Sequence, residues 1–121
     1  MALVGCATAR AVPPGYFEVE SREVRADRRA LNVRVSEYDR RFRAIALQAT
    51  GHAILVERVR VVYTQDDFVD FTEPVALDAG QCSDPLPLPG NYRSVRAVEV
   101  AYRVPSSVRV SGGRLHVFAL R

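Results

Sequence analysis

The side chains that most often carry out chemistry are few in this sequence, and their spacing matches no common catalytic arrangement. The two histidines, His52 and His116, are 64 positions apart and do not form an H-x-x-x-H or H-x-H pair. No serine stands in a G-x-S-x-G turn, and the Ser-Gly-Gly at 111–113 is typical of a turn, not of a phosphate loop. Cys82 has no histidine at the spacing of a cysteine nucleophile, which favours an ordinary loop or half-buried thiol. We therefore expect no catalytic residues, no metal site and no cofactor.

Three aspartates, Asp66, Asp67 and Asp70, are the candidates for contact with a ligand or a cation. Ca²⁺ takes several oxygen ligands, and these carboxylates are close along the chain. They lack the ordered D-x-[DN]-x-[DN]-G spacing of a calcium loop, and adjacent residues of an extended chain point apart. We favour the interpretation that this acidic stretch is solvated and pairs with arginines of neighbouring strands. The alternative is a calcium- or carbohydrate-binding β-sandwich, or a hydrolytic one, that uses the acidic 66–84 region.

That alternative needs exposed aromatic rings beside the aspartates, because sugars stack on such rings. Tyr63, Phe68 and Phe71 are the candidates for this platform. Strand alternation predicts that at least some of the three belong to the core.

Charge is divided unevenly along the chain. All 17 basic residues are arginines and the formal net charge is +3; residues 61–92 carry six acids and no arginine, while both flanks are basic. Four arginines alternate with core positions on long predicted strands. This basic stripe consists of Arg58, Arg60, Arg96 and Arg103. The stripe suits anionic glycan or lipid headgroups, although arginines also simply solvate an outer sheet face. A nucleic-acid surface interleaves aromatic residues with its arginines, so we expect no nucleic acid partner.

The positions of apolar residues repeat with a period of two, which predicts strands. Residues 17–22 and 31–35 alternate cleanly and are predicted to be strands with one solvated face. Residues 42–49 have small alanines opposite Ile45 and Leu47, which predicts a central strand packed on both faces. The longest run, 53–63, is predicted to place Leu55, Val59, Val61 and Tyr63 on one face. The tight Thr-Gly-His connection between these last two segments predicts a hairpin.

The second half of the chain continues the same pattern. Short strands are predicted at 68–71 and 75–77, and longer ones at 97–103 and 115–120. Turns are predicted at 105–107 and 111–113, with a brief segment at 108–110 between them. The proline-rich segment 84–90 lacks amide donors, so we expect it to run along a sheet edge with Leu86 and Leu88 on the core. About eight short strands without an amphipathic helix predict an all-β fold, an antiparallel β-sandwich, with a small β-barrel as the alternative.

The chain of 121 residues suits one domain, which we place at residues 16–121, and residues 1–15 form a separate leading segment. In that segment Leu3-Val4-Gly5-Cys6 resembles the lipobox of bacterial lipoproteins. The resemblance implies lipidation at Cys6, a flexible tether after it, and membrane attachment through lipid alone. Only five residues precede Cys6, whereas an export signal needs roughly 7–15 apolar residues, so the start is truncated or misplaced, or the similarity is chance. Cys6 and Cys82 pair in an exported chain only if Cys6 carries no lipid.

The order of several segments resembles a bacterial family of small exported domains of unknown function. The segments are residues 42–47, residues 54–63, the Leu-Pro-Leu-Pro-Gly at 86–90, and the arginine-containing strand 93–102 that ends in Tyr102. The resemblance covers roughly residues 16–121 and implies an envelope-located β-sandwich with no assigned reaction and no catalytic residues to transfer.

These observations together predict a non-catalytic domain of the bacterial cell envelope, either lipid-anchored or periplasmic or secreted. Its function is expected to be binding, with an envelope protein, a glycan or a lipid headgroup as the partner.

Overall fold

The computed structural model describes residues 12, 14–35, 41–90 and 94–121, and within them the chain forms β-strands without a helix. The strands are β1 (Tyr16–Glu23), β2 (Ala30–Arg34), β3 (Ala44–Thr50), β4 (Ile54–Tyr63), β5 (Phe68–Phe71), β6 (Val75–Leu77), β7 (Leu86–Pro87), β8 (Val95–Arg103) and β9 (Arg114–Leu120). All the pairings between them are antiparallel. The predicted all-β fold is confirmed.

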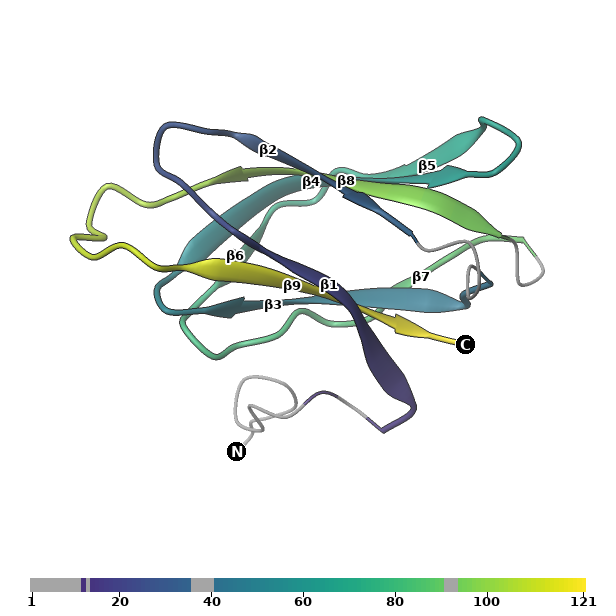
Figure 1. Cartoon of the computed structure of the whole chain (residues 1–121), viewed down its shortest axis with the longest axis horizontal. Helices are drawn as coiled ribbons and strands as arrows, with labels where there is room; N and C mark the ends of the chain where they lie inside the picture. Colours follow the sequence, from purple (N-terminus) through teal and green to yellow (C-terminus); the bar gives the residue numbers. More distant parts are fainter. Residues whose placement is uncertain (1–11, 13, 36–40, 91–93) are drawn as a thin grey trace.

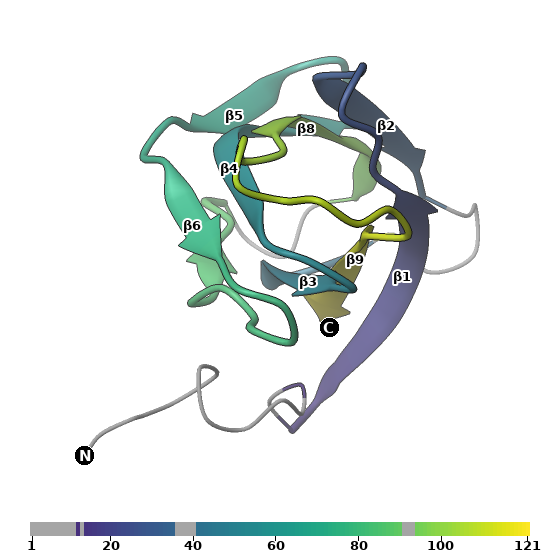
Figure 2. The same ribbon diagram turned by 90° about the vertical axis from the view of Figure 1, so that its left-hand side faces the viewer.

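The strands form two facing sheets (Figure 1). One sheet has the order β1-β9-β3-β7, and the other has the order β2-β8-β4-β5, with β6 also paired to β4. The sheets do not close into one barrel, so the β-sandwich prediction holds and the barrel alternative does not. Figure 2 looks along the layers, with the connection between β8 and β9 crossing the near end.

The core lies between the sheets and consists mainly of branched aliphatic side chains. Ile45, Val61, Val95 and Tyr102 are fully buried there. Strand β3 is buried along nearly its whole length, as predicted for a central strand with alanines on one face. Burial of both faces fixes the register of β3, because a slip by one residue would exchange its large and small side chains.

The predicted hairpin between residues 42–49 and 53–63 is wrong, because β3 and β4 lie in different sheets. The edges of β3 are occupied by β9 and β7, whereas β4 pairs with β8, β5 and β6. The connection at Gly51 therefore carries the chain from one layer to the other. A tight turn specifies that the chain reverses, but it does not specify which strand then becomes the partner.

The predicted face of β4 is correct only for its second half. Val59, Val61 and Tyr63 point into the core, but Leu55 is only partly buried and Val56 takes the core position instead. The cause is a register shift between Val56 and Arg58, where one extra residue reverses the alternation. Residues 108–110, the brief segment between two predicted turns, belong to the connection between β8 and β9.

The proline-rich segment follows a sheet edge, as predicted. Residues Leu86 and Pro87 form β7 against β3, and Leu88 is 8% exposed while Leu86 packs against the core. Just before it, the Ser83 N–H donates to the Leu47 carbonyl at 2.6 Å and the Leu47 N–H donates to Ser83 Oγ at 2.9 Å. These bonds continue the pairing of β3 where β7 has not yet begun.

We expect the substitution Ser83→Ala to lower the free energy of unfolding by about 1–3 kcal/mol, because it leaves the buried Leu47 N–H without an acceptor. Ser83 is 2% exposed, so water cannot replace the lost oxygen. Urea unfolding measures the change, with Ser106→Ala in an exposed turn as the control. Equal stability of the two variants would contradict this role of Ser83.

Candidate functional site

Three connections meet at one end of the sandwich, at the left of Figure 1, and enclose a pocket of about 390 Å³. They are residues 24–29 between β1 and β2, residues 51–53 between β3 and β4, and residues 104–113 between β8 and β9. The pocket is lined by Glu23, Val24, Arg25, Ala26, Asp27, His52, Val104, Val108, Val110 and Ser111. Its size lies within the range of small-molecule sites, and its lining combines valines with a few polar groups.

The wall of the pocket is held in place by a buried tyrosine. Tyr102 in β8 is fully buried, and its hydroxyl lies 3.2 Å from the Arg25 amide nitrogen and 3.4 Å from the Arg25 carbonyl oxygen. The Val24 N–H also donates to the Gly113 carbonyl at 2.9 Å. The first and third connections are thus joined to each other and to the core, so the pocket is formed before any ligand arrives.

His52 is the polar side chain set deepest in the pocket. It is 7% exposed, and its Nδ1 lies 2.8 Å from the Ala53 carbonyl oxygen. A carbonyl oxygen only accepts, so Nδ1 carries a proton, and in the neutral tautomer that fits this contact Nε2 presents a lone pair. Nε2 has no hydrogen-bond partner within the described residues. Because every fully buried side-chain nitrogen or oxygen among these residues has a partner, Nε2 is not fully buried. Nε2 is therefore accessible from the pocket.

Gly113 packs on the face of the His52 ring. A Cβ at Gly113 would lie 2.2 Å from Nε2, 2.4 Å from Cε1 and 2.6 Å from Cδ2. Such similar distances to three ring atoms place that position above the ring plane, not in line with the Nε2 lone pair. The glycine thus fixes the orientation of the ring without blocking its acceptor.

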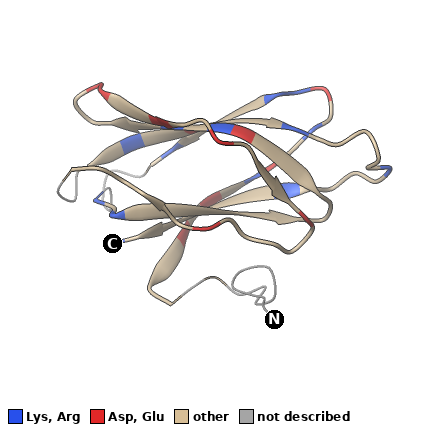
Figure 3. Cartoon of the chain, turned by 180° about the vertical axis from the view of Figure 1, so that it is seen from behind, with Lys and Arg blue, Asp and Glu red and all other residues tan. Residues whose placement is uncertain are grey.

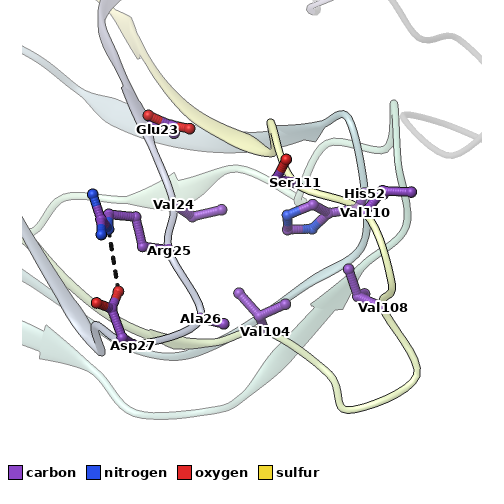
Figure 4. A pocket seen from close by; sticks show the side chains of 10 residues that line it. All are labelled: Glu23, Val24, Arg25, Ala26, Asp27, His52, Val104, Val108, Val110 and Ser111. Atoms are coloured by element: carbon purple, nitrogen blue, oxygen red, sulfur yellow. Dashed lines mark hydrogen bonds and ion pairs between the residues drawn. The ribbon is translucent and has the colours of Figure 1, made fainter.

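The charged residues of the pocket lie at its rim (Figure 4). Arg25 Nε is 3.2 Å from Asp27 Oδ1, and the two side chains turn toward each other and away from the His52 ring, whereas Val24 and Val104 point toward it. The hydrogen bond and charge of Arg25 hold the pKa of Asp27 below its usual value. Glu23 has no ion-pair partner among the described residues, so the three charged side chains that line the pocket include one more acid than base.

The three aspartates predicted to contact a cation do not converge. Asp66 lies in the turn after β4 with φ of 71° and pairs with Arg96 at 3.0 Å, whereas Asp70 in β5 pairs with Arg60. Within the part of the chain that the structure describes, no group of three His, Cys, Asp or Glu side chains is placed to hold a metal ion. The positions of these aspartates therefore give the calcium-binding alternative no support.

The candidate aromatic platform is not present as a continuous surface. Tyr63 is buried at 2% exposure and Phe71 packs against the core, whereas Phe68 is 51% exposed. The Phe68 ring lies 4.0 Å from the Arg60 guanidinium carbon, so one of its faces is already in contact with a cation.

The four arginines of the predicted basic stripe lie on β4 and β8, and three of them pair with acids. Arg60 binds both oxygens of Asp70 at 2.8 and 3.0 Å, Arg96 contacts Asp66, and Arg103 contacts Glu57 at 2.6 Å. Arg58 has no acidic partner among the described residues. Figure 3 shows acidic and basic positions interspersed over the strands. Three of the four positive charges of the stripe are thus paired with carboxylates of neighbouring elements.

We expect Asp70→Asn to cause a small loss of stability at neutral pH that disappears in acid. The hydrogen bond from Arg60 holds the pKa of Asp70 below its usual value, so the carboxylate stabilises the fold above the unfolded pKa of about 3.9. This contribution is lost as the pH falls through the folded pKa. Urea midpoints of both proteins from pH 7 to pH 2.5 measure it; a difference that stays constant over this range would contradict the assignment.

Cys82 is not the ordinary loop or half-buried thiol that the sequence favoured, and a disulfide was the alternative left open for an exported chain. It is disulfide-bonded and 3% exposed, beside the edge of β3. The sequence contains one other cysteine, Cys6, which was predicted to be lipidated and lies outside the described residues. Most of the tether predicted at residues 1–15 also lies outside the described residues. The first strand, β1, begins at Tyr16.

The second histidine belongs to a separate polar group on the outer face of the β1-β9-β3 sheet. His116 Nε2 lies 2.8 Å from Thr50 Oγ1, and Nδ1 lies 3.4 Å from Glu18 Oε2. The order hydroxyl, imidazole, carboxylate resembles a hydrolase triad. The contact with Glu18 is long, and the three side chains stand on three adjacent strands of a sheet face, so we interpret the group as a cross-strand link.

The pocket was missed by reasoning from the sequence, which predicted turns at residues 50–52, 105–107 and 111–113 but no contact between them. Its one sequence signal is the pair of glycine-containing turns, at residues 51 and 112–113, with His52 beside the first. Glycines allow close approach of two backbones. Which turns approach each other depends on the crossing of the chain between sheets, which was not predicted.

Fold and pocket together define this protein as an all-β sandwich domain whose candidate site lies among the loops at one end. The chain belongs to the family described as a domain of unknown function, DUF2541, whose model matches residues 3–119. Comparisons with curated proteins and with solved structures found no match. Among the described residues, no helix has the length and hydropathy that crossing a membrane requires.

Proposed function

We propose that this protein is a non-catalytic binding domain of the bacterial cell envelope and that the pocket at the end of the sandwich is its binding site. The observation that carries the proposal is the preformed wall. The Tyr102 hydroxyl and the bond between Val24 and Gly113 hold two loops in place, so ligand binding does not have to order them. Preorganisation of this kind lowers the entropic cost of binding.

The polar groups of the pocket favour binding over catalysis. A histidine that acts as general base is usually oriented by a carboxylate and activates a nearby nucleophile. His52 instead donates its Nδ1 proton to a main-chain carbonyl at 2.8 Å. The valines that surround it offer an apolar contact surface and carry no acidic, basic or nucleophilic group.

Two observations support a place in the envelope, and they are alternatives because each gives Cys6 a different modification. The start of the chain resembles a lipobox at residues 3–6, and Cys82 is disulfide-bonded. Structural disulfides persist in oxidising compartments such as the periplasm and are rare in the cytosol. An intrachain disulfide of Cys82 requires Cys6, so lipidation at Cys6 and this disulfide exclude each other. We favour the disulfide, and therefore a periplasmic or secreted domain over a lipid-anchored one.

Mass spectrometry of the protein isolated from its native host, without reduction, tests the compartment. We expect a peptide that joins Cys6 to Cys82 in the envelope or secreted fraction. A diacylglyceryl group on Cys6 would support the envelope location but would overturn the disulfide, because the protein would then be anchored to the membrane by lipid. Two free thiols in a cytosolic fraction would overturn the proposed location.

Native mass spectrometry of the same preparation tests binding at the pocket. We expect a small-molecule adduct that disappears on denaturation and is absent from Val108→Trp, in which the indole fills the pocket. Phe68→Trp adds the same ring to an exposed position of β5 and serves as the matched control. An adduct that persists in Val108→Trp, or no adduct on the unmodified protein, would overturn this site.

A further inference from the structure

The chemistry of the pocket restricts the ligand, if the proposed binding function is accepted. The accessible Nε2 of His52 accepts a hydrogen bond because its partner nitrogen, Nδ1, already donates to Ala53. The ring cannot exchange the two roles without losing that bond, and Gly113 on its face fixes its orientation. The deepest polar atom of the pocket is therefore a fixed acceptor.

The surroundings of this acceptor are apolar and uncharged. Val24 is 4% exposed and points toward the His52 ring, and Val104 does so from the opposite wall (Figure 4). A ligand group that reaches Nε2 therefore leaves water and packs against aliphatic side chains. A polar ligand group that cannot donate a hydrogen bond would be buried without a partner and would leave Nε2 without one. Burying unpaired polar atoms among aliphatic side chains costs binding free energy.

The same acceptor adds a preference of charge. Arg25 and Asp27 neutralise each other at 3.2 Å, and Glu23 remains as an unpaired acid among the described residues. The residues that line the pocket carry one more acid than base, whereas Arg28, Arg29 and Arg109 lie farther along the same two connections. A carboxylate or phosphate without a proton would meet the lone pair of Nε2 inside the pocket, so hydrogen bonding disfavours such anions.

From these three steps we infer that the pocket binds a small, uncharged, largely apolar molecule that carries a hydroxyl or N–H group, and that this group donates to His52 Nε2. The apolar body contacts the valines of the first and third connections. The recognition is a single donor-to-acceptor bond beside the valines of a pocket of about 390 Å³.

Three probes of nearly equal size separate the parts of this proposal. Cyclohexanol donates a hydrogen bond, cyclohexanone only accepts, and cyclohexanecarboxylate is an anion. The experiment is an NMR titration of the full chain at pH 8, which follows the ring nitrogens of His52 and the methyl groups of Val104 and Val108. The comparison of the three probes uses the unmodified protein, so that part of the experiment does not depend on the folding of a variant.

We expect cyclohexanol to bind about 2- to 10-fold more tightly than cyclohexanone, the factor that one net hydrogen bond provides. It should shift the Nε2 resonance of His52 more than that of Nδ1, and the carboxylate should bind most weakly. His52→Leu, which places an apolar side chain at this position and removes the acceptor, should abolish the preference for the alcohol.

The outcomes distinguish this inference from the proposed function on which it rests. Equal binding of alcohol and ketone at the valine methyls would overturn the donor requirement and leave the pocket as a binding site. Tighter binding of the carboxylate would overturn the charge preference. If none of the three probes shifts the valine methyls, both the ligand class and the pocket as a binding site are wrong.

Discussion

Replacing Gly51 with alanine is expected to lower the free energy of unfolding by about 2–5 kcal/mol, the sum of a backbone cost and a packing cost. Gly51 has a φ of +86°, a left-handed conformation that costs an alanine roughly 1–2 kcal/mol. A Cβ there would also lie 2.6 Å from the Gly112 carbonyl oxygen and 2.9 Å from Gly113 Cα. Both contacts are to backbone, so no side-chain rotation relieves them.

Gly80 provides the matched control for this prediction. It has the same φ of +86°, but a Cβ at Gly80 would meet nothing within 4 Å. Gly80→Ala therefore reports the backbone cost alone, and Gly51→Ala reports that cost with the collision added. Urea unfolding of both variants gives the difference, and equal destabilisation would show that the approach of residues 51 and 112–113 does not constrain the fold.

The reason for the large effect is the position of Gly51 in the topology. It lies where the chain passes from β3 in one sheet to β4 in the other, and it contacts the loop that makes the same passage from β8 to β9. The two crossings pack against each other at the end of the sandwich. A substitution that separates them also opens the pocket between them.

The alternation of residues along the chain predicted the strands and their buried faces, but not their partners. Burial on both faces of β3 followed from the alanines at 44 and 46, and the edge position of residues 86–88 followed from the prolines. These are local properties, decided by side-chain size and amide donors. The prediction of a hairpin at Gly51 was wrong because strand pairing depends on residues far along the chain, which for β3 are Arg114–Leu120.

The same limit explains the outcome for the candidate sites. Pairing of the acidic stretch with arginines of neighbouring strands was the favoured interpretation, and Asp66 and Asp70 indeed contact Arg96 and Arg60. Opposite charges on adjacent strands pair over short distances, so charge pattern alone was informative. The pocket required three loops to meet and one histidine tautomer to be fixed, and neither property is encoded in a local pattern.

Gly113→Ala is expected to be the second strongly destabilising change, by about 1–3 kcal/mol, because the new methyl group overlaps the His52 ring. Gly113 is not among the described glycines with positive φ, so an alanine there carries no cost of backbone conformation. The whole effect should come from the 2.2 Å approach of the Cβ position to Nε2. Removing the ring should therefore remove most of the effect.

A double-mutant cycle with His52→Ala measures this directly. In the His52→Ala background, Gly113→Ala should be nearly neutral, because the methyl group enters space that the ring has left. The unfolding free energies of the four proteins give the coupling, which we expect to be about 1–3 kcal/mol in the direction of mutual relief. If Gly113→Ala costs the same in both backgrounds, the His52 ring does not pack on Gly113. The glycine then does not fix the orientation of the His52 acceptor, on which the proposed recognition in the pocket depends.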